Sequence, residues 1–541
     1  MSHPFDILIR SGIVCDGTGS EPYAADIGIR GDRIAMIAKI SGSASCEHLA
    51  AARKTIHAQA LIVAPGFIDT HGHSEFSLLS DPRAEGKISQ GITTEINGNC
   101  GLSAAPLFGE ALKQRESDLD EYGITERWST FKEYFAVLER RKPAVNYCTL
   151  TGHGNLRASV VGYEDRRISR SDLQMMRTML ADAMHEGAIG MSTGLIYPPG
   201  IYADTEELIE LCRMLVSSEN DGPCMYASHM RSEGDGLIES IGEAIAIAEG
   251  SGIRVHISHL KTSGERNWHK LDEAVSVIEK ARNGGVVVTG DRYPYTAAST
   301  DLDTVLPSWT YEGGAEEELR RLQNPETRLR IRREILVQHP EPGYWEKIII
   351  TSVASEKNRW MEGKTIPHIS HHQRCEPVDA VIGILIEEYL RVGAIFSSMD
   401  EKNLEKILSL PYIMIGTDSS ARSFDGVTCR GKPHPRGFGS FPRFLGRFVP
   451  ALAGMNLNTA IQKITFLPAH TFGISGRGVL REGAFADITI FDSEKVLDKA
   501  TYEEPFLQSE GIHYVIVNGV PAVWDRKLTG LRGGRVLRRG I

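Results

Sequence analysis

The chain has 541 residues, of which 41% are hydrophobic and 24% are charged, and its net charge is −10. A chain of this length buries a large core without disulfides, and its slight acidity argues against a nucleic-acid partner. The sequence contains no run of about 18 apolar residues, so we predict neither a membrane span nor a membrane partner. The eight scattered cysteines form no CxxC pair, and the N-terminal residues lack the features of a signal peptide, so we expect a reduced, cytoplasmic protein.

Both ends of the chain alternate apolar and polar residues between Gly, Asn and Asp turns, which is the pattern of β-hairpins. The strands predicted in this way lie at 6–10, 25–30, 33–37, 486–491, 513–517 and 520–524. We predict that residues 1–60 and 476–541 together form one small composite β-sandwich domain.

The middle of the chain, residues 61–475, alternates strand-like apolar runs with amphipathic segments of helical length. Such alternation is typical of parallel βαβ units, and eight units predict an α/β protein with a (β/α)8 TIM-type barrel. Two further runs, 347–353 and 394–398, leave ten candidate strands for eight places, and we predict an inserted subdomain at about 298–345. The eight runs are 61–69, 92–97, 145–151, 188–193, 223–228, 253–258, 286–290 and 412–417.

Chemically active side chains follow five of these runs, at the ends where such barrels hold their active sites. His71 and His73 follow the first run, and residues two apart in an extended segment face the same side. The second, fifth, sixth and eighth runs are followed by Cys100, His229, His259 and Asp418. Imidazole, thiolate and carboxylate groups bind zinc, so the sequence predicts a metal site in the barrel.

Each of these residues also has an ordinary structural interpretation. A single histidine at a strand end is commonly a hydrogen-bonded structural residue, and a lone cysteine such as Cys100 behaves as a small buried hydrophobe. Asp418 precedes Ser419 and Ser420 and would suit the N-cap of a helix. The joint placement of all six residues at strand ends favours the metal site.

Several motifs carry a resemblance to a known family. Pro-Gly-Phe-Ile-Asp-Thr-His-Gly-His at 65–73 resembles the opening metal motif of the amidohydrolase superfamily, a metal-dependent barrel on a composite β-domain. Gln-Gly-Ile-Thr-Thr-Glu-Ile-Asn-Gly-Asn-Cys-Gly at 90–101 resembles the D-aminoacylase branch, the N-acyl-D-amino-acid deacylases. Further resemblance to this branch is found in the segments 227–231, 257–261, 291–295, 434–443 and 478–488.

The resemblance implies a zinc centre. A tight zinc would be held by Cys100, His229 and His259, and a weaker second site would use His71 and His73 with the same cysteine. Many dinuclear relatives bridge their metals with a lysine after the fourth strand, but residues 190–199 contain no lysine. Sulfur and imidazole ligands favour zinc over magnesium or calcium.

The resemblance also implies the catalytic and substrate-binding groups. Zinc would polarise the amide carbonyl, while Asp418 would take a proton from water and pass it to the leaving amine. Asp301 and Asp303 would repel the side-chain carboxylates of N-acyl-D-glutamate and N-acyl-D-aspartate. The amino-acid pocket would be lined by Lys261, Tyr293, Ser299, Arg436 and Tyr197.

We therefore predict zinc-dependent hydrolysis of the amide bond of N-acyl-D-amino acids, which gives a carboxylate and a D-amino acid. Two alternatives stay open at this point. One is a cyclic-amide hydrolase of the hydantoinase or dihydroorotase kind, and the other is a non-catalytic scaffold with the same fold. Residue patterns alone distinguish neither D from L substrates nor one oligomeric state from another.

Overall fold

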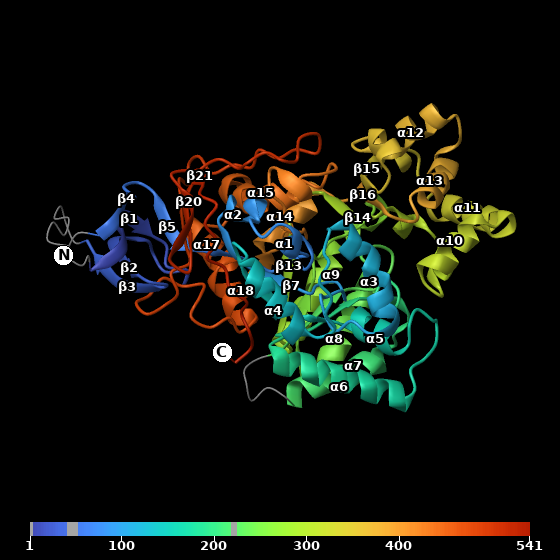
Figure 1. Cartoon of the computed structure of the whole chain (residues 1–541), viewed down its shortest axis with the longest axis horizontal. Helices are drawn as coiled ribbons and strands as arrows, with labels where there is room; N and C mark the ends of the chain where they lie inside the picture. Colours follow the sequence, from blue (N-terminus) through green and yellow to red (C-terminus); the bar gives the residue numbers. More distant parts are fainter. Residues whose placement is uncertain (1–3, 41–51, 218–223, 541) are drawn as a thin grey trace.

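The computed structural model describes residues 4–40, 52–217 and 224–540. Both chain ends contribute to a nine-stranded sheet in the order β21-β20-β19-β18-β5-β1-β2-β3, with β4 paired to β1. The blue and red strands of this sheet lie side by side at one end of the molecule (Figure 1). Its members are β1 (Phe5–Val14), β2 (Tyr23–Arg30), β3 (Arg33–Lys39), β4 (Ala52–His57), β5 (Ile62–Pro65), β18 (Ile488–Phe491), β19 (Ile512–Val517), β20 (Val520–Trp524) and β21 (Lys527–Leu528).

The alternation seen in the sequence explains why the two chain ends meet. Ile27 and Ile29 of β2 and Ile488 and Ile490 of β18 point to the same side of their strands and are fully buried in one hydrophobic cluster. β18 pairs with β5, so the C-terminal segment joins the sheet at the strand that leads into the middle of the chain.

The middle of the chain forms two parallel sheets, ordered β6-β7-β8 and β9-β10-β11-β12-β13-β17. Only Leu150 separates β8 from β9, and an isolated parallel bridge joins Gly72 after β6 to Ser419 after β17. The ends of β6 and β17 therefore lie next to each other. The strands are β6 (Phe67–Asp69), β7 (Ile92–Asn97), β8 (Asn146–Thr149), β9 (Thr151–Gly152), β10 (Gly190–Gly194), β11 (Met225–His229), β12 (Arg254–Ile257), β13 (Val288–Arg292) and β17 (Ile413–Ile415).

Helices connect these parallel strands. α6 shows why they form: Ser169 and Asp172 make a capping box at its start, and Gly187, with φ +118°, ends it. Neighbouring helices α6, α7 and α8 pack side by side at the lower edge in Figure 1. Each of the eight predicted runs contains a strand in its described residues. Residue 223, the first residue of the fifth run, lies outside the described part. The helices are α1 (Ser77–Ser80), α2 (Glu85–Ile88), α3 (Gly109–Glu121), α4 (Phe131–Arg141), α5 (His153–Val160), α6 (Arg170–Glu186), α7 (Thr205–Ser217), α8 (Leu237–Ser251), α9 (Leu271–Asn283), α14 (Glu401–Ser409), α15 (Arg436–Arg443), α16 (Val449–Ala451), α17 (Leu457–Ile464) and α18 (Phe466–Thr471).

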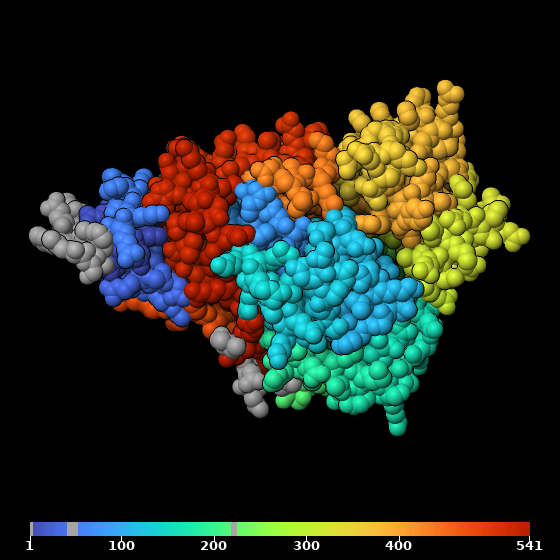
Figure 2. Space-filling model, viewed as in Figure 1, coloured from blue at the N-terminus to red at the C-terminus, as the bar shows by residue number. Residues whose placement is uncertain are grey.

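A separate unit projects at the end of the molecule opposite the nine-stranded sheet, where yellow and gold atoms protrude (Figure 2). Its antiparallel sheet, in the order β14-β16-β15, carries the two surplus strands of the sequence, and its hydrophobic cluster runs from Leu302 to Ala394. The unit therefore continues well past residue 345. Its elements are β14 (Ala297–Asp301), α10 (Ala315–Gln323), α11 (Pro325–Gln338), β15 (Ile348–Val353), α12 (Ile366–Gln373), α13 (Pro377–Glu387) and β16 (Val392–Ser397).

Among the described residues, every helix falls short of the length and apolar composition needed to cross a bilayer.

Candidate metal centre and active site

The first strand of the parallel sheets delivers two histidines to the same edge. His71 and His73 follow β6, whose three residues are all buried. Gly72 between them donates its N–H to the Ile96 carbonyl, and a Cβ there would lie 2.8 Å from the Asn97 Oδ1 atom. A side chain at this position would therefore displace the Asn97 amide, whose Oδ1 atom accepts from the Ser74 backbone N–H.

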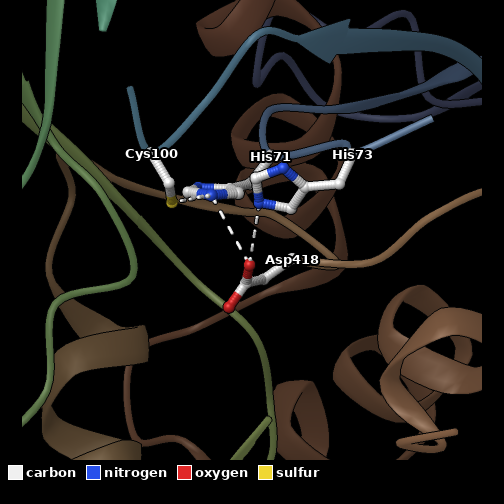
Figure 3. Close-up of side chains that lie close together, drawn as sticks. All are labelled: His71, His73, Cys100 and Asp418. Carbon is white, nitrogen blue, oxygen red and sulfur yellow. Dashed lines mark hydrogen bonds and ion pairs between the residues drawn. The ribbon is translucent and has the colours of Figure 1, made fainter. Parts of the chain in front are cut away.

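Four side chains meet just beyond these strand ends (Figure 3). The ligand atoms of His71, His73, Cys100 and Asp418 all lie within 4.8 Å of one another, and we call this group the His–Asp cluster. His71 Nε2 lies 3.3 Å from Cys100 Sγ, and Asp418 Oδ1 lies 3.6 Å from His71 Nε2 and 3.2 Å from His73 Nε2. Imidazole nitrogen, thiolate sulfur and carboxylate oxygen atoms this close together could bind one metal ion.

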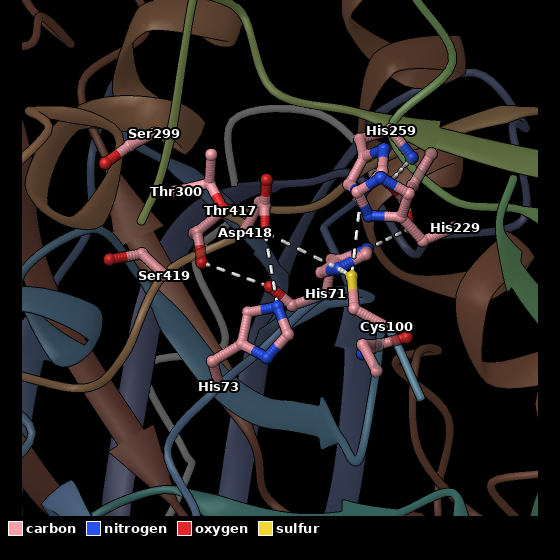
Figure 4. A network of polar contacts seen from close by, with 12 residues as sticks. His71, His73, Cys100, His229, His259, Ser299, Thr300, Thr417, Asp418 and Ser419 are labelled. Atoms are coloured by element: carbon pink, nitrogen blue, oxygen red, sulfur yellow. Dashed lines mark hydrogen bonds and ion pairs between the residues drawn. The ribbon is translucent and has the colours of Figure 1, made fainter. Parts of the chain in front are cut away.

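A second group shares the same cysteine (Figure 4). The ligand atoms of Cys100, His229 and His259 also lie within 4.8 Å of one another, and we call this group the Cys–His–His cluster. Cys100 Sγ is 3.6 Å from His259 Nε2. Both ring nitrogens of His229 are buried without a hydrogen-bond partner in the part of the chain that the structure describes. A buried imidazole in that state fits a zinc ligand, because ion binding would satisfy the free nitrogen.

The charge state of Cys100 agrees with a metal-binding role. Burial raises the pKa of its thiol, but His71 and His229 nearby lower that pKa well below its ordinary value. The thiolate is the form that binds metal ions. Cys100 therefore differs from Cys212, whose pKa is raised by burial alone.

Three residues of the two clusters have backbone conformations that are unusual for residues other than glycine. The φ angles are +54° for Cys100, +36° for His259 and +49° for Asp418. Such residues cost about 1–3 kcal/mol each and concentrate at functional sites. The turns after three separate strands are thus all held in a geometry that points a reactive side chain into the site.

Asp418 follows β17, and no helix of the described chain begins within the next seven residues. The alternative interpretation of Asp418 as a helix N-cap is therefore wrong. Its Oδ2 atom instead forms an ion pair with Arg436 Nη1 at 2.8 Å. Burial raises the pKa of Asp418, but Arg436 and His71 hold it well below its ordinary value. Asp418 thus connects the two histidines of the His–Asp cluster to a buried arginine.

The five residues predicted to bind substrate all line one cavity of about 1550 Å³, together with His73 and both clusters' shared cysteine. Arg436 lies over the Tyr293 ring at 4.7 Å and donates to the Ser299 carbonyl at 3.1 Å. The Tyr197 ring lies 4.9 Å from the His229 ring. Lys261 lines the same cavity, but its Nζ atom forms an ion pair with Glu233.

Two carboxylates that orient the histidines, Glu233 and Asp291, were assigned no role from sequence patterns. Glu233 Oε1 accepts from His259 Nδ1 at 2.8 Å, and its pKa is lowered by Lys261 and His259 against the effect of burial. Asp291 lies 3.1 Å from His71 Nδ1 and accepts from the His259 backbone N–H at 2.7 Å. Carboxylates in these positions fix the tautomer and orientation of a ligand histidine. In the sequence, the only sign of this role is that both carboxylates lie within a few residues of predicted site residues.

The model of the amidohydrolase family matches residues 54–298 and 421–523. The chain is 36% identical to the D-aminoacylase of Alcaligenes xylosoxydans xylosoxydans, over 99% of this chain and 98% of the relative. The chain belongs to the amidohydrolase family. The resemblance to its D-aminoacylase branch is confirmed.

Two further relatives of this amidohydrolase are named for an acidic substrate, N-acyl-D-glutamate. The N-acyl-D-glutamate deacylase of the same organism is 35% identical over 100% of this chain and 98% of the relative. The N-acyl-D-glutamate deacylase of Bordetella bronchiseptica, solved with zinc and a phosphonate mimic of the tetrahedral intermediate, matches with a TM-score of 0.81 and 34% identity. That match covers 99% of each chain, so this chain has the mixed α/β fold of the family.

Proposed function

We propose that this amidohydrolase cleaves the amide bond of N-acyl-D-amino acids in a zinc-dependent reaction, which gives a carboxylate and a D-amino acid. The observation that carries the proposal is the position of Asp418. One of its oxygens faces two histidines of the His–Asp cluster, and the other pairs with Arg436 in the same cavity. Full-length similarity to deacylases of such substrates supports it.

The Cys–His–His cluster is proposed to hold the tight zinc ion, and His71 and His73 with Cys100 the weaker site. Zinc in these positions would supply Lewis acidity that polarises a carbonyl group and makes water more acidic. The unpartnered nitrogens of His229 and the lowered pKa of Cys100 support the first assignment. Glu233 keeps His259 oriented so that its Nε2 atom faces Cys100.

Asp418 is proposed to move the proton. Its Oδ1 atom would accept a proton from the attacking water and deliver it to the leaving nitrogen, which must be protonated before the amide bond breaks. The left-handed backbone at Asp418 and its ion pair with Arg436 fix the carboxylate in position. Proton transfer over one hydrogen-bond length needs such a fixed group.

Arg436 is proposed to bind the substrate carboxylate, with Tyr293 and Lys261 beside it. A guanidinium binds a carboxylate through two parallel hydrogen bonds, and Arg436 is only 5% exposed, so this contact would be shielded from water. The unpartnered hydroxyl of Tyr293 supplies a further donor. Ser299 holds the guanidinium through its carbonyl oxygen, and Tyr197 covers the acyl side near His229.

We further propose that β6 to β13 and β17 close into one (β/α)8 barrel on a β-sandwich formed by 1–60 and 476–541. The short link at Leu150 and the bridge from Gly72 to Ser419 support closure. The inserted unit would comprise residues 297–397, which is longer than the sequence suggested. The absence of a lysine in β10 and the residues that follow it disfavours a cyclic-amide hydrolase with a bridging lysine.

The proposal is tested by incubating the zinc-loaded protein with racemic N-acetyl amino acids and separating the free amino acids on a chiral column. We expect free D-amino acids together with unreacted N-acetyl-L-amino acids. Release of L-amino acids alone, or ring opening of hydantoins without action on the linear amides, would contradict the proposal.

A further inference from the structure

One wall of the cavity carries carboxyl groups that pair with no cation of the described residues. They come from Asp301 at the end of β14, from Asp303 in the turn that follows, and from Glu318 in α10. All three side chains line the cavity, and none of them forms an ion pair with a residue that the structure describes. We call these three residues the acidic wall.

The acidic wall begins close to the His–Asp cluster and the Cys–His–His cluster. The ring of Tyr197 contacts that of His229, and the Tyr197 hydroxyl is 3.1 Å from Thr300 Oγ1. Thr300 directly precedes Asp301 in β14. Figure 4 shows Thr300 and Ser299 on the same side of the site as Asp418. A substrate held at Arg436 and the clusters would therefore extend its side chain toward this wall.

Glu318 adds an observation that is independent of the acidic composition. Its side chain is 4% exposed and lines the cavity, yet its Oε1 atom has no hydrogen-bond partner among the described residues. A buried acceptor without a donor costs about 1–3 kcal/mol, and such groups normally have a partner. A ligand that donates hydrogen bonds at this wall would supply that partner.

The carboxyl groups of the wall disfavour one another's ionisation. Burial and the neighbouring Asp301 raise the pKa of Asp303 to about 8, and burial and Asp303 raise that of Glu318 to about 9. A cation between these groups would reverse the repulsion and favour their charged forms.

The nearby arginines already have other partners. Arg115 forms an ion pair with Asp118 at 2.6 Å, and Arg321 donates to the Thr310 carbonyl at 2.9 Å and to the Glu312 carbonyl. Although both arginines lower the pKa of wall residues, neither is within ion-pair distance of them. Among the described residues, the wall therefore has no cation within ion-pair distance, and it offers carboxyl oxygens to a ligand.

We propose that the acidic wall binds a cationic substrate side chain, so that the preferred substrates are N-acyl-D-amino acids that end in an ammonium or guanidinium group. The proposal rests on the amide hydrolysis proposed above. A cation of that kind donates hydrogen bonds to the free oxygen of Glu318 and neutralises the wall. An acidic side chain would meet repulsion there.

The test compares kcat/KM for N-acetyl-D-lysine with kcat/KM for N-acetyl-D-norleucine, which has a side chain of similar length without charge. We expect the native protein to prefer the lysine substrate at least tenfold. In Glu318→Gln and in Asp301→Asn this ratio should fall at least fivefold. Glu317→Gln removes a carboxylate from the same helix outside the cavity and should keep the native ratio.

The outcomes separate the two proposals. Cleavage of both substrates with a ratio near one, or with a ratio that Glu318→Gln and Asp301→Asn leave unchanged, would overturn the acidic wall as a cation site while amide hydrolysis stands. A zinc-loaded protein that cleaves neither these substrates nor N-acetyl-D-glutamate would overturn both proposals.

Discussion

Lys87 and Asp69 form an ion pair with 2.7 Å between Nζ and Oδ2, and both side chains are fully buried. Asp69 also accepts from the backbone N–H groups of His71 and Thr417, at 3.1 and 2.8 Å. Lys87 donates to the Ser419 carbonyl at 2.9 Å. This pair therefore fixes the segment that carries His71 and His73 against the loop that carries Asp418.

The Lys87→Met variant should be strongly destabilised. It leaves the carboxylates of Asp69 and Glu95 buried without their shared cation, and breaking a buried ion pair in this way costs about 3–5 kcal/mol. The free energy of unfolding, measured by chemical denaturation, reports the loss. Lys113→Met removes an exposed lysine from its ion pairs and should cost at most about 1 kcal/mol. Equal effects of the two substitutions would contradict this role of Lys87.

The zinc ligands can be tested by metal content. Cys100→Ala should lose most bound zinc and most activity, because both clusters share this sulfur. His71→Asn should lose less zinc, since it affects only the weaker site. Cys212→Ala removes another buried cysteine that belongs to neither cluster and should keep its zinc. A full zinc complement in Cys100→Ala, measured by elemental analysis, would show that the ligand assignment is wrong.

Proton transfer can be tested with Asp418→Asn, which keeps the shape of the side chain. Zinc should stay bound, while kcat should fall by roughly 10²–10⁴-fold because the proton acceptor is missing. Asp425→Asn changes an exposed carboxylate of the same loop and should leave kcat within twofold of the native value. Near-native turnover of Asp418→Asn would exclude Asp418 as the proton acceptor.

Arg436→Met should lower kcat/KM for N-acyl-D-amino acids by roughly 30-fold or more. Loss of one partner of a desolvated charge pair costs about 2–5 kcal/mol, at about 1.4 kcal/mol per tenfold. An amide analogue without the carboxylate, which the native protein should cleave poorly, should lose less activity, because only the ion pair to Asp418 is missing. Because Arg436 also contacts Asp418, equal losses on both substrates would show that it acts through Asp418 instead.

Lys463 in α17 provides a test of pH-dependent stability. It is 2% exposed, and burial lowers its pKa from an ordinary value of 10.5 to about 7. Between these values the unfolded chain keeps a proton that the native chain releases, so stability rises with pH by up to about 1.4 kcal/mol per pH unit. Below pH 7 the contribution is constant. Lys463→Met should therefore show a smaller rise between pH 7.5 and 9.5 in denaturation experiments, and an unchanged slope would contradict the buried, neutral state.

Much of the site could be predicted because it depends on local patterns. Apolar runs of strand length place Cys100, His229 and His259 at strand ends, and parallel strands bring those ends to one edge. The strand β7 was predicted at its observed limits, since all six of its residues are buried and polar turns bound it. Family resemblance added roles for these residues, and those roles stay predictions.

Other features depend on contacts that sequence spacing does not contain. Lys87 lies in a short helix with no motif. Its structural role depends on its contacts with Asp69 and with Thr417, which is 330 residues from Lys87 in the sequence. The inserted unit that we propose is longer than the predicted one, because 347–353 and 394–398 resemble strands of the parallel sheets, whereas they pair antiparallel with each other. Glu233 looked like one loop carboxylate among many until its distance to His259 was known.

The most direct test of the central claim is a zinc titration of the metal-free protein, followed by release of D-amino acid from an N-acetyl-D-amino acid. The account predicts no activity without metal and activity that rises in proportion to the first equivalent of zinc, with Cys100→Ala inactive throughout. Full activity in the metal-free protein, or a zinc-loaded native protein that releases no D-amino acid, would contradict it.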